Sequence, residues 1–219
     1  MGAKRKEKWI KSYKNIKKPP HWALSLEPSK LAVFFLSIFK KNKLTKEKVL
    51  EIGCGNGRDS LYFTKKGLEV VGIDISAKAI ALAKKNKEKV LKNKILLKSL
   101  HFKKADAEKL PFPDEYFGGI YSIAVLHSTN LRKSIREIFR VLKKGGIAII
   151  HLWQKTIFLQ TGKVEESCPP EKLKAIIKKF PIKTLKFSKD IQAKGIDYEE
   201  GDKNPHRHLA IIMVLFKKK

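Results

Sequence analysis

A glycine-rich turn between two short apolar segments constrains this chain more than any other feature. Residues 49–59 read Val-Leu-Glu-Ile-Gly-Cys-Gly-Asn-Gly-Arg-Asp, and residues 70–76 read Val-Val-Gly-Ile-Asp-Ile-Ser. The apolar run before the glycines predicts a buried strand, and Gly53, Gly55 and Gly57 let the backbone turn tightly and approach a ligand closely. A helix pattern and a second apolar strand follow, so the segment is a strand–helix–strand unit of a parallel sheet.

The second strand ends on Asp74. An acid about 20 residues after a glycine turn accepts hydrogen bonds from the hydroxyl groups of a ribose. Taken alone, Asp74 could instead cap the following helix, as could Ser76. The glycine turn on the neighbouring strand favours a nucleoside site.

The spacing Gly-x-Gly-x-Gly after Glu51 differs from the dinucleotide fingerprint, whose third glycine comes one residue later. It resembles the first motif of class I S-adenosylmethionine (SAM)-dependent methyltransferases, of types 11 and 25. Two further stretches resemble motifs of that family: Asp-Ala-Glu-Lys-Leu-Pro-Phe-Pro-Asp-Glu-Tyr-Phe at 106–117, and Arg-Val-Leu-Lys-Lys-Gly-Gly at 140–146. Gly118 departs from the family pattern, which usually has an acid there. The similarity covers about residues 48–153.

Strands and helices alternate along the chain, which predicts an α/β fold with a doubly wound, mostly parallel sheet. The resemblance implies seven strands in the order 3-2-1-4-5-7-6, with an antiparallel last strand. Residues 1–47 are expected to form an N-terminal helical extension or cap, and 48–219 the methyltransferase domain.

The remaining elements are predicted from periodicity and from proline and glycine signals. We expect Pro28 to open the first long helix, with Leu31, Phe34, Phe35, Ile38 and Phe39 on its apolar side. The other expected helices are 77–89, 131–142 and 171–179. The other expected strands are 101–105, 119–125, 147–153, 182–187 and 209–216, with a Lys-rich turn before the first and the turn 143–146 before the third.

The resemblance implies a role for each residue of the cofactor site. The loop from Glu51 through Gly53, Gly55 and Gly57 would approach the methionine part of SAM, and Asp74 would hold the ribose hydroxyls. The adenine ring would meet the Asp106 carboxylate, the Ala107 N–H and the Ile75 side chain. Ala124, after the fourth strand, and Tyr13, in an N-terminal aromatic segment, complete the set. Asp106 could also simply cap a turn, and Tyr13 could be an ordinary packed aromatic.

Methyl transfer is a direct displacement, so the protein mainly aligns the acceptor and excludes water. A base is needed only where the acceptor loses a proton. His127 is the best-placed candidate, although it could equally cap a helix or support the cofactor; His206 is a weaker candidate. The absence of Asn/Asp-Pro-Pro-Tyr after the fourth strand argues against adenine or glutamine-amide methylation. No set of side chains has metal-ligand spacing.

The sequence gives conflicting signals about the acceptor. The net charge of +28 favours a polyanionic partner, but only six of the 49 basic residues are arginine and the lysines are dispersed. The acids within 197–202 favour a cationic or neutral small acceptor instead. Residues 57–63 resemble the thiopurine and tellurite-resistance methyltransferases, whereas 122–127 and 146–153 resemble tRNA wobble-uridine methyltransferases.

We therefore predict a SAM-dependent methyltransferase with a small-molecule acceptor. A tRNA methyltransferase is the first alternative, and a non-catalytic SAM-binding partner protein is the second. Two cysteines give no disulfide framework, and no secretory or membrane-spanning segment is evident, which predicts a cytoplasmic protein without a membrane partner. The sequence gives no indication of oligomeric state.

Overall fold

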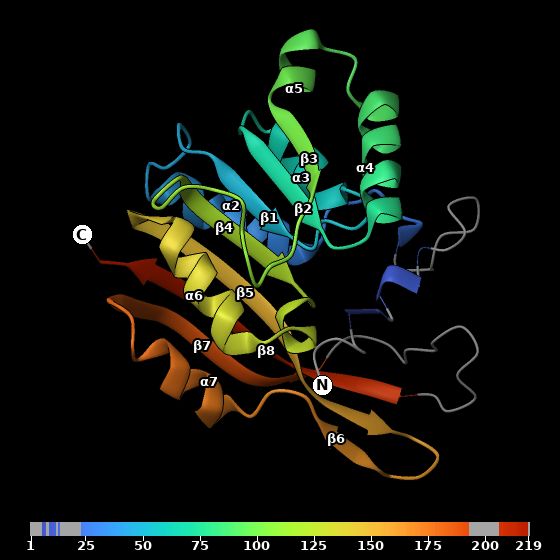
Figure 1. Ribbon diagram of the computed structural model, residues 1–219, viewed down its shortest axis with the longest axis vertical. Helices are drawn as coiled ribbons and strands as arrows, with labels where there is room; N and C mark the ends of the chain where they lie inside the picture. Colours follow the sequence, from blue (N-terminus) through green and yellow to red (C-terminus); the bar gives the residue numbers. More distant parts are fainter. Residues whose placement is uncertain (1–5, 8, 12, 14–22, 193–205, 219) are drawn as a thin grey trace.

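The computed structural model describes residues 6–7, 9–11, 13, 23–192 and 206–218. One sheet runs through it in the order β3-β2-β1-β4-β5-β8-β7, and a short strand, β6, pairs with β5 (Figure 1). The strands are β1 Val49–Ile52, β2 Val70–Asp74, β3 Leu100–Lys104, β4 Phe117–Ile123, β5 Leu142–Phe158, β6 Val164–Glu166, β7 Ile182–Gln192 and β8 His206–Lys217.

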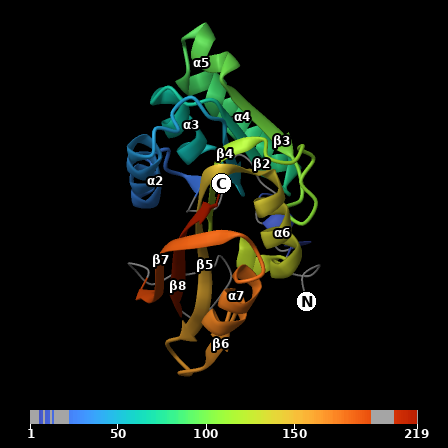
Figure 2. The same cartoon turned by 90° about the vertical axis from the view of Figure 1, so that its left-hand side faces the viewer.

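Helices cover both faces of this sheet (Figure 2). Buried side chains of α2, α3 and α4 share one apolar cluster, and those of α6 and α7 share the cluster on the opposite face. The helices are α2 Lys30–Lys41, α3 Arg58–Lys65, α4 Ala77–Val90, α5 Lys94–Lys98, α6 Leu131–Val141 and α7 Pro170–Ile177, with a 3₁₀ turn, η2, at Leu126–Ser128. No helix in this described part of the chain is long and apolar enough to cross a bilayer.

The predicted topology is confirmed. Strands β1 to β5 pair in parallel, whereas β8 is antiparallel to both β5 and β7. The strand count is corrected from seven to eight because β6 was missed. This strand has three residues, all exposed, so it carries none of the apolar alternation that marks a half-buried strand.

Several predicted boundaries are wrong. The segment 143–146, expected to be a turn, belongs to β5, which pairs with β4 from Leu142 and with β8 as far as Phe158. The expected Lys-rich turn before β3 contains α5, whose start is capped by the Asn93 side chain. Both β7 and β8 are longer than expected because they pair with each other beyond their apolar centres.

The first long helix also differs in detail from the prediction. Ser29, not Pro28, caps α2, since its hydroxyl accepts a hydrogen bond from the Ala32 N–H at 3.1 Å. Phe34 is 36% exposed and lies off the apolar face. The buried face follows helical spacing and consists of Ala32, Phe35, Leu36 and Phe39.

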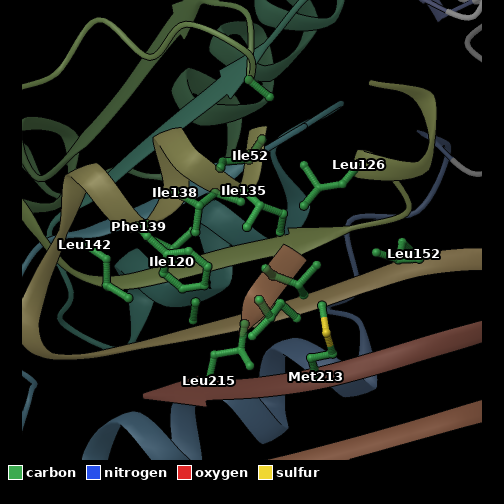
Figure 3. Close-up of a cluster of buried hydrophobic side chains, with 14 of the residues drawn as sticks. Ile52, Ile120, Leu126, Ile135, Ile138, Phe139, Leu142, Leu152, Met213 and Leu215 are labelled. Carbon is green, nitrogen blue, oxygen red and sulfur yellow. The ribbon is translucent and has the colours of Figure 1, made fainter. Parts of the chain in front are cut away.

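The two apolar clusters fix the sheet between its helices. Figure 3 shows the α6 and α7 side, where Ile120 of β4 and Leu152 of β5 lie among side chains of α6 and β8. The next residue along β4, Tyr121, points to the other face and packs against Phe35 and Phe63. With both faces packed, the loops at the carboxyl ends of the strands are left to form a site.

Candidate functional site

The glycine loop and Asp74 lie together at the carboxyl ends of β1 and β2. The Gly53 N–H donates to the Ile73 carbonyl at 2.7 Å, and the Gly55 N–H donates to Asp74 Oδ2 at 3.0 Å. Asp74 Oδ1 accepts from the Ser76 N–H at 2.8 Å, while Ser76 itself caps α4. Ser76, rather than Asp74, is therefore the helix cap. Both carboxylate oxygens of Asp74 accept hydrogen bonds from backbone N–H groups.

Asp74 is an unusual carboxyl group electrostatically. Burial raises its pKa, while the backbone N–H groups of Ser76 and Gly55 act in the opposite direction. Each carboxylate oxygen uses one lone pair on these backbone donors and keeps another for a further donor. A ribose diol provides two such donors.

The three loop glycines have different structural roles, although all have left-handed φ angles of 77°, 52° and 83°. A Cβ on Gly53 would lie 2.1 Å from a Val125 methyl, and one on Gly57 would lie 2.7 Å from the Phe102 ring. A Cβ on Gly55 would meet only the Tyr13 hydroxyl, at 2.8 Å. The outer two glycines are therefore required by packing against other elements, whereas the group that limits a side chain at Gly55 is the Tyr13 hydroxyl.

Glu51 lies beneath the loop. Its side chain is 5% exposed and accepts a short hydrogen bond from the Ser60 hydroxyl of α3. Burial, reinforced by the nearby Asp59 carboxylate, raises the pKa of Glu51 well above its ordinary value. The structure thus brings Glu51 under the predicted cofactor loop and ties it to α3.

Asp59 organises a second buried group of polar side chains that the sequence analysis missed. Its carboxylate accepts from the Ser29 N–H at 2.8 Å, the Ser29 hydroxyl at 2.9 Å and the Tyr121 hydroxyl at 3.2 Å. These bonds join the start of α2 to α3 and β4. Asp59 lies two residues after Gly57, but nothing in its immediate sequence indicates partners 30 and 62 residues away.

The N-terminal segment crosses the carboxyl edge of the sheet. Lys6 Nζ lies 2.7 Å from Asp106 Oδ2 and 2.6 Å from a Glu108 oxygen. Trp9 Nε1 donates to the Ser128 hydroxyl at 2.9 Å, and Tyr13, which is 5% exposed, reaches the glycine loop. The segment therefore spans from the end of β3 to the loop after β1.

Asp106 makes the local contact expected of a turn-capping acid as well. Its Oδ1 accepts from the Glu108 N–H at 2.9 Å. Ala107 is buried, and Ile75 is half-buried immediately after Asp74. Because β2 and β3 pair in parallel, these three residues lie at the same edge as the glycine loop.

The end of β4 carries a backbone feature of its own. Ala124 has a φ angle of 54°, a left-handed conformation that is uncommon for any residue other than glycine. Its N–H donates to the His151 carbonyl at 2.9 Å, which joins β4 to β5 at this point. The residue after it, Val125, is the one that packs against Gly53.

The two candidate histidines lie in different places. His127 Nδ1 accepts from the Trp153 N–H at 3.3 Å, and this hydrogen bond assigns the proton of a neutral ring to Nε2. His206 is 2% exposed and pairs with Phe158 at the far end of the β5–β8 ladder. The structure does not bring His206 to the glycine loop. The acids within 197–202 lie outside the described residues.

A cleft of about 600 Å³ opens beside the loop, on the α2 face of the sheet. Its lining comes from α2, α3, β4, β5 and β8 and consists of Ser29, Lys30, Leu31, Arg58, Ile123, His151, Trp153 and Ile212. The sequence analysis named none of these as site residues, because they meet only once β5 and β8 have paired. The available sequence signal was the alternation His151-Leu152-Trp153, which places two aromatic rings on the same face of a strand.

Comparison with known proteins agrees with this geometry. Residues 50–150 match a family model described as a methyltransferase domain. The chain is 33% identical over 125 residues to a ubiquinone/menaquinone biosynthesis C-methyltransferase of Pectobacterium carotovorum, covering 55% of this chain and 48% of that protein. It is 36% identical over 123 residues to a sterol 24-C-methyltransferase of Gibberella zeae, covering 54% and 31%. The chain thus spans about half or less of the length of these relatives.

Solved structures share the fold at lower identity. A SAM-dependent methyltransferase from Methanosarcina mazei has a TM-score of 0.62 and 20% identity, covering 83% of this chain and 97% of that one. A phosphoethanolamine N-methyltransferase of Haemonchus contortus, solved with SAM, has a TM-score of 0.67 and 18% identity, covering 96% and 57%. Over residues 50–150, this chain is therefore similar to S-adenosylmethionine-dependent methyltransferases.

Proposed function

We propose that this chain transfers a methyl group from SAM to a small-molecule acceptor held in the cleft beside the glycine loop. The observation that carries the proposal is continuity between the cleft and the predicted cofactor site. Arg58 of the cleft directly follows Gly57, and Ile123 directly precedes Ala124. A volume of about 600 Å³ lies within the range of small-ligand sites.

The residues around the loop fit SAM. A Cβ at Gly55 would meet the Tyr13 hydroxyl, the group proposed to close over the cofactor, and the Gly55 N–H is committed to Asp74. Asp74 would hold the ribose hydroxyls and Asp106 the adenine amine, with Ile75 and Ala107 against the ring. Ala124 and the three glycines would surround the methionine part, with Glu51 supporting the loop from below and Tyr13 closing over it.

When bound, SAM would supply a methyl group on a positively charged sulfur, which an electron pair of the acceptor would take as the carbon–sulfur bond breaks and its electron pair stays on sulfur. The protein's task is to align the acceptor atom and exclude water. Because His127 Nδ1 already accepts from the Trp153 N–H, we assign His127 no part in removing a proton from the acceptor. We therefore propose a positioning role for His127.

The N-terminal part of the chain supports this arrangement. We propose that residues 1–47 act as an extension that covers the domain 48–219. Helix α2 packs its buried face against the sheet, and Lys6, Trp9 and Tyr13 reach the carboxyl edge. Such a cover would exclude water from the reacting atoms.

Transfer of radiolabelled methyl from SAM tests the proposal. The chain is incubated with labelled SAM and either a panel of small acceptors, including quinols and sterols because the relatives' names indicate them, or total tRNA. We expect label in the small-molecule fraction. Label only in tRNA would support the tRNA alternative. SAM binding without transfer to either would support a non-catalytic partner.

A further inference from the structure

We infer that the acceptor cleft takes a planar, apolar compound that carries an anionic group, with the flat body beside Trp153 and the anion facing Arg58 and Lys30. The inference rests on the proposed function, since it specifies the acceptor class for the same cleft. Three features of the lining carry it: a fixed aromatic wall, a positive rim and an unpaired imidazole nitrogen.

Trp153 forms the aromatic wall, and its ring is held by neighbours. The indole stacks on His208 with ring centroids 4.4 Å apart and an angle of 16° between the planes. His151 meets it edge-on at 4.9 Å and 79°. A ring already fixed in this way offers a large apolar surface at little cost in conformational entropy. Ile123 and Ile212 add further apolar surface, which suits a flat hydrophobic body.

The rim of the cleft is positive. Of the lining residues, Arg58 and Lys30 are cations and none is an acid. Among the described residues, the acid paired with the Arg58 guanidinium is Asp59, at 3.8 Å from Nε, and Asp59 already accepts three shorter hydrogen bonds. Arg58 therefore keeps most of its donors for a ligand, and a carboxylate or phenolate matches them better than an ammonium group does.

His151 marks a polar contact within the apolar part of the cleft. Its Nδ1 is the one buried side-chain nitrogen or oxygen without a hydrogen-bond partner in the part of the chain that the structure describes. Buried polar atoms are normally paired, and His151 lines the cleft, so a polar group of the ligand that reaches this nitrogen would supply its missing partner. Burial, with a smaller effect of His208, lowers the pKa of His151 to about 4, so the ring adds a hydrogen bond without adding charge at neutral pH.

This inference replaces the expectation of a cationic or neutral acceptor. That expectation depended on the acids within 197–202, which lie outside the described residues. The described lining has the opposite sign of charge. The cleft itself therefore favours an anion.

Three probes that share one ring system test the inference. The full chain is titrated calorimetrically, in saturating S-adenosylhomocysteine, with 2-naphthoate, 2-naphthylmethanol and 2-naphthylmethylammonium. We expect 2-naphthoate to bind about tenfold more tightly than the ammonium compound, since one charge-assisted hydrogen bond accounts for that ratio. Equal binding, or tighter binding of the ammonium compound, would overturn the inference.

Matched variants locate the bound probe. Trp153→Ala should weaken 2-naphthoate about tenfold, and Trp153→Leu, which keeps an apolar side chain, serves if the alanine variant does not fold. Arg58→Gln should remove the preference for the anion. Lys186→Gln is the charge control, because this cation lies over Phe34, outside the cleft. Unchanged 2-naphthoate binding in a folded Trp153 variant would contradict the assignment.

Failure of the inference can be separated from failure of the proposed function. If the chain binds 2-naphthoate with this selectivity but transfers no methyl group, the assignment of the cleft stands and the proposed activity is refuted. If the chain methylates cationic amines and does not bind the anionic probe, the proposed activity stands and the inferred acceptor class is refuted.

Discussion

The two halves of the sheet present different surfaces at their carboxyl ends. Around β1 and β2 the surface is mainly backbone: glycines with left-handed φ angles and the Asp74 carboxylate held by two N–H groups. Around β5 and β8 the surface consists of rings, with His151, Trp153 and His208 packed on one another. The first surface comes from one stretch of chain, and the second from strands that are distant in sequence.

This contrast indicates two kinds of ligand recognition, one by backbone atoms and one by side chains. A backbone surface fits its ligand by shape and tolerates no added Cβ, so it suits a cofactor that never varies. A surface of side chains can change its specificity without disturbing the sheet, so it suits the acceptor. We therefore expect substitutions in the first half to change SAM binding and substitutions in the second half to change acceptor binding.

Gly55→Val should give the largest effect on the cofactor half. A β-branched side chain at a φ of 52° is strained, and its Cβ would lie 2.8 Å from the Tyr13 hydroxyl that is proposed to close over SAM. We expect SAM affinity to fall on the order of 100-fold, measured by calorimetry. Gly145→Val is the matched control, because its φ of 78° imposes similar strain with nothing within 4 Å. Equal SAM affinity in both variants would contradict the backbone account.

Asp59→Ala should destabilise the junction between the halves. Removing the carboxylate takes away the acceptor of the Ser29 N–H and of the two hydroxyls of Ser29 and Tyr121, which keep only their hydrogen bond to each other at 2.8 Å. We expect the free energy of unfolding to fall by about 3 kcal/mol, measured by urea denaturation. Tyr121→Phe removes one donor only and should cost about 1 kcal/mol. An Asp59→Ala variant as stable as the parent chain would show that this group of bonds is unimportant.

His151 should make the acceptor half sensitive to acid. Its pKa is about 4 in the folded chain against 6.5 ordinarily, so between these values the unfolded chain takes up a proton that the folded chain does not. Stability should therefore fall as pH drops from 7 to 4, by about 2–3 kcal/mol from this residue. The difference in unfolding free energy between the parent chain and His151→Gln should change with pH by that amount. A constant difference would contradict the lowered pKa.

Lys6→Ala should have the smallest effect, and it should strengthen SAM binding rather than weaken it. Lys6 pairs with the Asp106 carboxylate that the adenine amine would use, so its removal should tighten SAM binding about two- to fivefold. Lys11→Ala removes an ion pair of the same segment, with Glu7, and should leave SAM affinity unchanged. Weaker SAM binding in Lys6→Ala alone would show that Lys6 assists the cofactor instead.

The first half of the sheet was predictable because its signals are local. A strand, a glycine turn, a helix and an acid follow one another within 49–74, and their order alone places them at one edge of a parallel sheet. The family resemblance supplied the strand order. The structural roles of Gly53 and Gly57 were not visible, because they depend on Val125 and Phe102 from other elements.

In the second half, the lengths of the strands and the residues that line the cleft were not predictable, for the complementary reason. The length of β5 is set by pairing with β4 on one side and β8 on the other, so Lys143-Lys144-Gly145-Gly146 resembles a turn in isolation. The cleft lining comes from five elements. His206 was a reasonable candidate by residue type, but the register of β8 against β5 places it opposite Phe158.

Calorimetric titration of SAM into two variants tests the central claim most directly. Asp74→Ala removes the predicted ribose acceptor, and Trp153→Ala removes the aromatic wall of the cleft. The division between halves predicts that Asp74→Ala weakens SAM by about 10–150-fold, whereas Trp153→Ala leaves SAM affinity within about twofold of the parent chain. Unchanged affinity in folded Asp74→Ala, or an equal loss in both variants, would contradict the division.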